Sequence, residues 1–154
     1  MCLLPYTKYI MQNEKTVLCG NQVYVHQRIT DASDLKHYYN FGQKLGNGCF
    51  GIVVQAQEKL TEKKWAIKII LKSKANETLG GESFRSIERE IIILKMVNHP
   101  HIIHLEKVFE SPKKIYLILE LCREELATAF KKKKRFTEDE TRYVLKQLVS
   151  AGPT

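Results

Sequence analysis

Three glycines and one lysine form the most informative chemical pattern in the sequence. Gly46, Gly48 and Gly51 form a G-x-G-x-x-G pattern, and Lys68 follows seventeen residues after the last of them, inside the apolar run WAIKIIL. Closely spaced glycines let a backbone approach phosphate groups, and a lysine supplies a positive charge for them. Two unrelated folds use this glycine pattern, so the elements around it must decide between them.

The residues after Gly51 favour a strand over a helix. Ile52, Val53 and Val54 are β-branched, which makes them good strand formers and poor helix formers. A dinucleotide-binding unit would begin a helix at this point. The chain also lacks the G-K-[ST] ending of a P-loop. The sequence therefore predicts a strand, a glycine loop and a second strand.

A carboxylate partner for Lys68 is predicted on the next helix. Apolar residues recur there at steps of three and four, at Phe84, Ile87, Ile91 and Leu94. Glu90 lies on this stripe, where a carboxylate without a partner is costly. Lys68 is the one charged residue of the apolar run WAIKIIL, so it likewise needs a partner of opposite charge. We therefore predict that the two side chains pair. The alternative is that Lys68 extends to solvent and Glu90 lies at the edge of the stripe.

The other elements follow from periodicity. Strands are predicted over residues 39–46, 51–60, 65–71, 102–110 and 113–122, with turns at 61–64 and 111–114. A last helix is predicted from Glu138 to about Ala151, because Thr137 and Glu140 form a capping box before an apolar stripe. Residues 1–36 show no sustained period, and we place a boundary near residues 34–37.

Composition excludes several classes of protein. A chain of 154 residues with 44% apolar and 27% charged residues suits one globular domain, or one domain and part of another. No run approaches the roughly 18 apolar residues of a membrane helix, and the first residues lack a signal-peptide pattern. The four cysteines are scattered, which is typical of reduced thiols. We expect a cytoplasmic location, with the nucleus as the alternative.

The net charge of +8 suits anionic partners without choosing among them. Part of it lies in KKKKR, residues 131–135, which we interpret as a solvated loop, with a nuclear-import or nucleic-acid-binding patch as the alternative. No aromatic residues alternate with these lysines as stacking platforms for bases, so we do not expect a nucleic-acid partner. His99, His101 and His104 lack a fourth ligand, and no metal site is predicted among them.

These motifs, taken in order, resemble the amino-terminal lobe of eukaryotic protein kinases from about Tyr38 to Cys122. WAIK, HPHIIHL, LELC and FTEDETR are similar to the calcium/calmodulin-kinase-like serine/threonine group. The resemblance implies an α+β fold, in which a five-stranded antiparallel sheet with one regulatory helix precedes the first two helices of a truncated C-lobe. It divides the chain into a weakly structured extension (1–37), an N-lobe (38–122) and a hinge exit with C-lobe helices (123–154).

The resemblance also implies a role in ATP binding for particular residues. The loop from Gly46 through Asn47, Gly48, Cys49 and Phe50 to Gly51 and Ile52 would cover the phosphates. Leu45, Val53 and Ala66 would hold the adenine, Leu119 would stand at the back of the pocket, and the backbone of Glu120 and Cys122 would bind the adenine edge. Lys68 would orient the α- and β-phosphates and be held by Glu90. Glu125 is the expected ribose-binding acid, with Glu124 as the alternative.

Parts of the family pattern are missing from the sequence. It contains no His-Arg-Asp, Asp-Phe-Gly or Ala-Pro-Glu, and its only aspartates are Asp31, Asp34 and Asp139. Phosphoryl transfer needs an aspartate for the substrate hydroxyl and ligands for Mg²⁺. We therefore expect a kinase truncated before its catalytic and metal-binding loops, which binds ATP but does not transfer phosphate to protein Ser or Thr alone. The alternative is a non-catalytic protein that competes with an intact kinase or self-associates through its exposed last helix.

Overall fold

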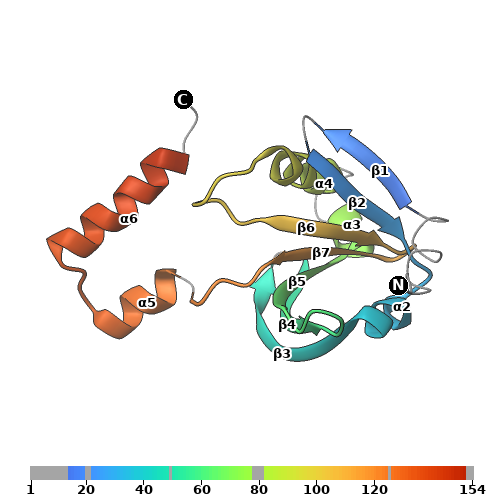
Figure 1. The fold of residues 1–154 in the computed structure, drawn as a ribbon, viewed down its shortest axis with the longest axis horizontal. Helices are drawn as coiled ribbons and strands as arrows, with labels where there is room; N and C mark the ends of the chain where they lie inside the picture. Colours follow the sequence, from blue (N-terminus) through green and yellow to red (C-terminus); the bar gives the residue numbers. More distant parts are fainter. Residues whose placement is uncertain (1–13, 20–21, 49, 78–81, 125, 152–154) are drawn as a thin grey trace, which may run out of the picture.

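The computed structural model describes residues 14–19, 22–48, 50–77, 82–124 and 126–151, which form one mixed sheet with helices around it (Figure 1). The strands are β1 (Glu14–Cys19), β2 (Gln22–Arg28), β3 (Tyr39–Gly48), β4 (Gly51–Glu58), β5 (Lys64–Leu71), β6 (Leu105–Glu110) and β7 (Lys114–Glu120). The helices are α2 (Ala32–Tyr38), α3 (Lys72–Glu77), α4 (Glu82–Met96), α5 (Leu126–Lys133) and α6 (Glu138–Ala151). None of the described helices is long and apolar enough to cross a membrane.

The predicted five-stranded antiparallel unit is present. Strands β3 to β7 lie in the order β6-β7-β5-β4-β3, and each neighbouring pair is antiparallel. Helix α4 lies between the third and fourth of these strands along the chain, as predicted. This confirms the α+β fold with an N-lobe sheet.

The strand count was wrong, because the sheet has seven strands among the described residues. Strand β1 pairs with β2 in antiparallel fashion, and β2 joins the free edge of β6 in parallel. Pairing at a sheet edge is made by backbone groups, so it does not require apolar residues in alternation. A second helix, α3, also lies between β5 and α4.

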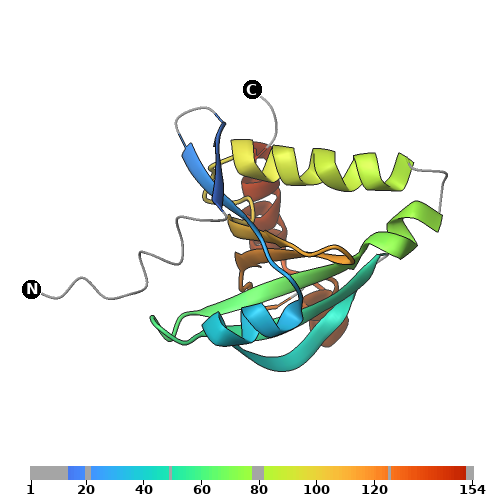
Figure 2. The ribbon, with the colours of Figure 1, turned by 90° about the vertical axis from the view of Figure 1, so that its right-hand side faces the viewer.

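The sheet has a hydrophobic core on each face, and a different helix covers each one (Figure 2). Helix α4 contributes Ile87 and Ile91 to the first core, and helix α2 places the fully buried Leu35 in the second. The predicted stripe on α4 is confirmed at these positions, and Leu94 packs beside them. The side chain of Phe84 lies outside the described residues.

The last two helices extend away from the sheet (Figure 1). The predicted capping box begins α6: the backbone N–H of Thr137 donates to the Glu140 carboxylate at 3.0 Å, and the Glu140 N–H donates to Thr137 Oγ1 at 3.2 Å. Helix α6 has no buried residue. Leu145, Leu148 and Val149 are 53%, 60% and 78% exposed.

Part of the lysine run is helical, whereas the sequence predicted a loop. Lys131 and the two lysines after it form the last turn of α5, where positive charge is favourable beside the helix C-terminus. Lys132 forms an ion pair with Glu124, and Lys133 forms one with Glu140. The run therefore ends one helix and links it to its neighbours.

Candidate functional site

The predicted pair between Lys68 and Glu90 is formed. Lys68 lies in the middle of β5, Glu90 lies on α4, and Lys68 Nζ donates to Glu90 Oε1 at 2.6 Å. The pair is less buried than predicted, since the two side chains are 26% and 46% exposed. Glu90 lies at the edge of the apolar stripe, so its carboxylate is held by Lys68 while remaining open to solvent.

The register of the sheet places the predicted pocket residues around this lysine. Lys68 lies opposite Val53 on β4, and two positions earlier Ala66 lies opposite Leu119 on β7. Opposite residues share a face of the sheet, and so do residues two apart along a strand. Ala66 and Leu119 are each only 7% exposed, and Val53 packs against the same core. The floor beside Lys68 is therefore apolar.

The glycine loop joins β3 to β4 as a strand–loop–strand unit, as predicted, and Gly48 lies opposite Gly51. The three glycines differ in their surroundings. A Cβ atom would meet nothing within 4 Å at Gly46, and at Gly48 it would meet only the Gly51 carbonyl oxygen, at 3.9 Å. At Gly51 it would lie 1.8 Å from the Ile69 carbonyl oxygen. Gly51 is therefore required for the close approach of β4 to β5, which the sequence did not indicate.

The other described residues in and beside the glycine loop differ in their exposure to solvent. Leu45, Asn47 and Ile52 are exposed, whereas Phe50 is partly buried and packs against the core beneath α4. The Phe50 carbonyl accepts from the Leu71 N–H at 2.9 Å, which ties the loop to the end of β5. Cys49 lies outside the described residues.

The segment after β7 passes the same apolar floor. Glu120 and Cys122 are exposed, and Cys122 is a free thiol. The Glu120 N–H donates to the His104 carbonyl at 2.9 Å, which fixes the start of this segment. The Glu124 carboxylate is engaged by Lys132. Glu125 lies outside the described residues, so its role stays a prediction.

The three histidines lie in the connection between α4 and β6 and at its end. The His99 and His101 rings meet edge to face at 5.5 Å, and the His101 N–H donates to His99 Nδ1. His104 pairs with Glu106 at 3.2 Å. In the part of the chain that the structure describes, no group of three or more potential ligands comes together in a way that could hold a metal ion.

Comparison with known proteins finds similarity over most of the chain. Residues 39–152 match the protein kinase domain family. The chain is 47% identical over 127 residues to serine/threonine-protein kinase 33 of Mus musculus, an alignment that covers 82% of this chain and 25% of the relative. It is 37% identical over 120 residues to myosin light chain kinase A of Dictyostelium discoideum (77% of this chain, 39% of the relative). It is 38% identical over 151 residues to calcium-dependent protein kinase 5 of Plasmodium berghei (97% and 24%).

The family match covers well over half of the chain, so the chain belongs to the protein kinase domain family. Its relatives include serine/threonine kinases of the calcium/calmodulin-kinase-like group, as the motifs predicted. The chain spans about a quarter of the length of serine/threonine-protein kinase 33.

Proposed function

We propose that the sheet and α4 form the ATP-binding part of a serine/threonine protein kinase. The observation that carries this proposal is the ion pair between Lys68 and Glu90 beside the glycine loop. The surroundings fit a nucleoside triphosphate, because the space next to Gly46 and Gly48 is open and the floor at Ala66 and Leu119 is apolar. Bound ATP would supply the phosphoryl group, with Mg²⁺ as its expected companion in the family.

Each part of the site has a distinct task in this proposal. The backbone between Gly46 and Gly51 covers the phosphates, and Lys68, oriented by Glu90, neutralises their charge. The adenine would contact Leu45, Val53 and Ala66. Further residues then complete the pocket: Leu119 at the back, the backbone of Glu120 and Cys122 at the adenine edge, and Glu125 at the ribose.

We further propose that the chain does not transfer phosphate by itself. Each of its three aspartates is engaged elsewhere: Asp31 accepts from the Ser33 N–H at 2.5 Å, Asp34 accepts from the Thr30 N–H at 2.7 Å, and Asp139 pairs with Arg142 at 3.3 Å. A phosphotransferase needs an aspartate at the substrate hydroxyl and ligands for the metal, and the intact relatives would hold both.

Nucleotide titration of the purified chain tests the binding site. We expect weak ATP binding that Lys68→Met reduces by about tenfold or more, because a charge-assisted contact to phosphate is lost. Lys64→Met is the matched control, since Lys64 is an exposed lysine on the same strand. Equal, measurable affinity in the wild type and Lys68→Met would show that the proposed pocket is wrong.

A radioactive-phosphate transfer assay tests the absence of catalysis. We expect no incorporation into a Ser- or Thr-containing protein above that of a reaction without the chain. Incorporation that Lys68→Met abolishes would show that the chain holds catalytic groups which we have not recognised.

A non-catalytic interaction role is the second candidate, and the exposed apolar residues of α6 favour it. Leu145, Leu148 and Val149 lie in water, and each forgoes roughly 1.5–3 kcal/mol relative to full burial. We propose that this face binds a second copy or competes with an intact kinase for partners. Sedimentation should show concentration-dependent association that Leu148→Gln weakens. A strictly monomeric chain that leaves the activity of an intact relative unchanged would count against both forms of this role.

A further inference from the structure

Strand β2 closes an edge that the five-stranded sheet would otherwise leave open. Residues from Val25 to Arg28 run parallel to residues from Lys107 to Glu110 on β6. Just after β2, the Ile29 N–H donates to the Glu110 carbonyl at 2.9 Å. An unpaired strand edge readily accepts another strand, and here the chain fills its own edge.

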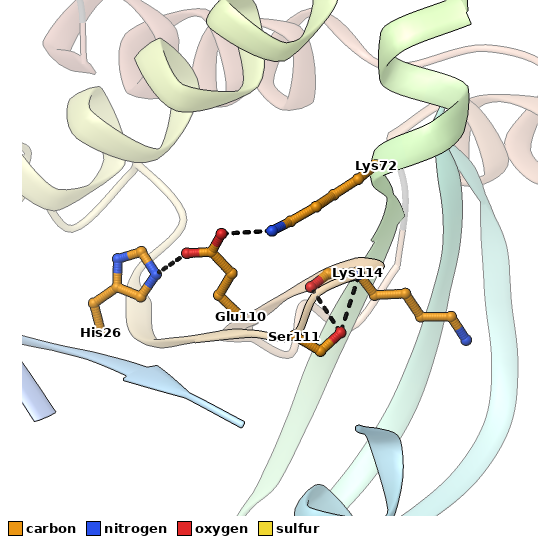
Figure 3. Close-up of polar contacts among 5 residues, drawn as sticks. All are labelled: His26, Lys72, Glu110, Ser111 and Lys114. Carbon is orange, nitrogen blue, oxygen red and sulfur yellow. Dashed lines mark hydrogen bonds and ion pairs between the residues drawn. The ribbon is translucent and has the colours of Figure 1, made fainter. Parts of the chain in front are cut away.

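The Glu110 carboxylate joins three separate elements (Figure 3). His26 Nε2, on β2, lies 3.0 Å from Glu110 Oε2, and Lys72 Nζ, at the start of α3, lies 2.5 Å from Glu110 Oε1. The three side chains are between 20% and 28% exposed. Because an ionised carboxylate only accepts hydrogen bonds, His26 donates through its Nε2–H. One carboxylate therefore binds β2 and α3 to the end of β6.

The two elements that Glu110 contacts, β2 and α3, also lie close to α4. Helix α3 lies close to α4, and Lys72, its first residue, donates its backbone N–H to the Lys113 carbonyl at 3.0 Å. Strand β2 lies beside the C-terminal end of α4 (Figures 1 and 2). There the buried Lys95 of α4 is close to His26, and burial together with its charge lowers the pKa of that histidine. Helix α4 therefore has a contact to this network at each end.

We propose that β1 and β2 form an intramolecular strap, fastened by Glu110, that holds α4 where Glu90 meets Lys68. The inference rests on the proposed function in one respect, because the pair that it positions is the proposed nucleotide contact. Glu110 is a positioning residue in this scheme and does not touch the nucleotide. Loss of its charge should release β2 and loosen α4, and should weaken nucleotide binding only through Glu90.

Amide hydrogen exchange on the full chain tests the strap without nucleotide. In Glu110→Gln we expect exchange at residues 26–28 and along α4 to rise by about tenfold or more, with β4 and β5 changing less. Glu106→Gln is the matched control, because Glu106 lies on the same strand and pairs with His104 at 3.2 Å. Unchanged exchange, release of β2 without α4, or an equal rise across the whole sheet would each overturn the strap.

A double-mutant cycle in nucleotide binding tests the link to Glu90. We expect Glu110→Gln to weaken ATP binding by about threefold to tenfold, and to have no further effect in a Glu90→Gln background. Additive effects in the two backgrounds would contradict positioning through Glu90. If the wild type binds no nucleotide, the proposed function fails while the exchange experiment still decides the strap. Should Glu110→Gln fail to fold, His26→Gln, which removes one contact only, takes its place in both experiments.

Discussion

The sheet and helix α6 have equally clear apolar patterns, but only the sheet buries its apolar residues. Ile67, Leu117 and Ile118 have no exposed surface, whereas α6 has no buried residue. The sheet is covered on both faces, by α4 and by α2. Helix α6 depends on local interactions, which include its capping box and the ion pair between Arg142 and Glu138. An amphipathic pattern therefore predicts a helix but does not supply its partner.

Truncating one leucine in each region should give the largest contrast. Leu117→Ala removes a fully buried side chain from β7, and we expect it to lower the free energy of unfolding by about 2–5 kcal/mol. Leu148→Ala, on exposed α6, should change it by less than about 0.5 kcal/mol. Urea unfolding followed by tryptophan fluorescence measures both, because Trp65 lies in the sheet core. Similar losses of unfolding free energy in the two variants would contradict the proposed difference between the sheet and α6.

Two glycines of one loop should respond differently within the sheet. Gly51→Ala places a Cβ 1.8 Å from the Ile69 carbonyl oxygen, and the strands must move apart because the obstacle is backbone. We expect a loss of about 1–3 kcal/mol. Gly48→Ala, whose Cβ meets only an atom at 3.9 Å, should fold with nearly the stability of the wild type. Thermal melts compare them, and an unaltered melt for Gly51→Ala would contradict the close approach of the strands.

The capping box should affect the stability of α6 and leave that of the sheet unchanged. Thr137→Ala removes the hydroxyl that accepts from the Glu140 N–H, at a cost of about 1 kcal/mol to the helix. Because α6 buries nothing, we expect lower helicity at 222 nm and an unchanged melting temperature of the sheet. Ser150→Ala, at the other end of the helix, is the control. A sheet that melts several degrees lower in Thr137→Ala would reveal coupling between the two regions.

The smallest expected effect is a dependence of sheet stability on pH. Burial and the charge of Lys95 lower the pKa of His26 below its ordinary 6.5, although Glu110 opposes them. Burial tends to raise the pKa of Glu110, but the hydrogen bond and charge of Lys72, together with His26, lower it below its ordinary 4.5. The unfolded chain then binds more protons in acid, so stability falls as pH drops.

The pH ranges in which His26 and Glu110 affect stability can be separated by substitution. His26 stabilises the fold above about pH 6.5, and Glu110 does so above about pH 4.5. Each contribution is lost as the pH falls below these values. Each loss lowers the free energy of unfolding by less than roughly 1 kcal/mol, because water reaches both groups. Urea midpoints between pH 7.5 and 3 measure the loss. His26→Gln should flatten the upper window and Glu110→Gln the lower one. Curves that coincide with the wild type would show that the network does not titrate with folding.

Five of the strands, helices α4 and α6 and the pair at the site could be predicted from the sequence alone. Strand and helix periodicity, the glycine spacing and the capping residues are local properties, and each was visible within about twenty residues. Lys68 and Glu90 could be matched because each was a charged residue on an otherwise apolar face. The dipeptide Gly20-Asn21 lies between two segments that contain Thr, Val and Tyr, which is a sequence signal for a hairpin of β1 and β2.

How the elements meet could not be predicted from the sequence. The need for glycine at position 51 comes from the approach of β5, and the Glu110 network joins His26 to a residue 84 positions away. The sequence around Glu110, LEKVFE, is that of an ordinary strand, and it does not show which side chains arrive from other elements. Sequence patterns record which face of an element is apolar, whereas contacts over long sequence separations depend on how the sheet orders its strands and on which helix covers each face.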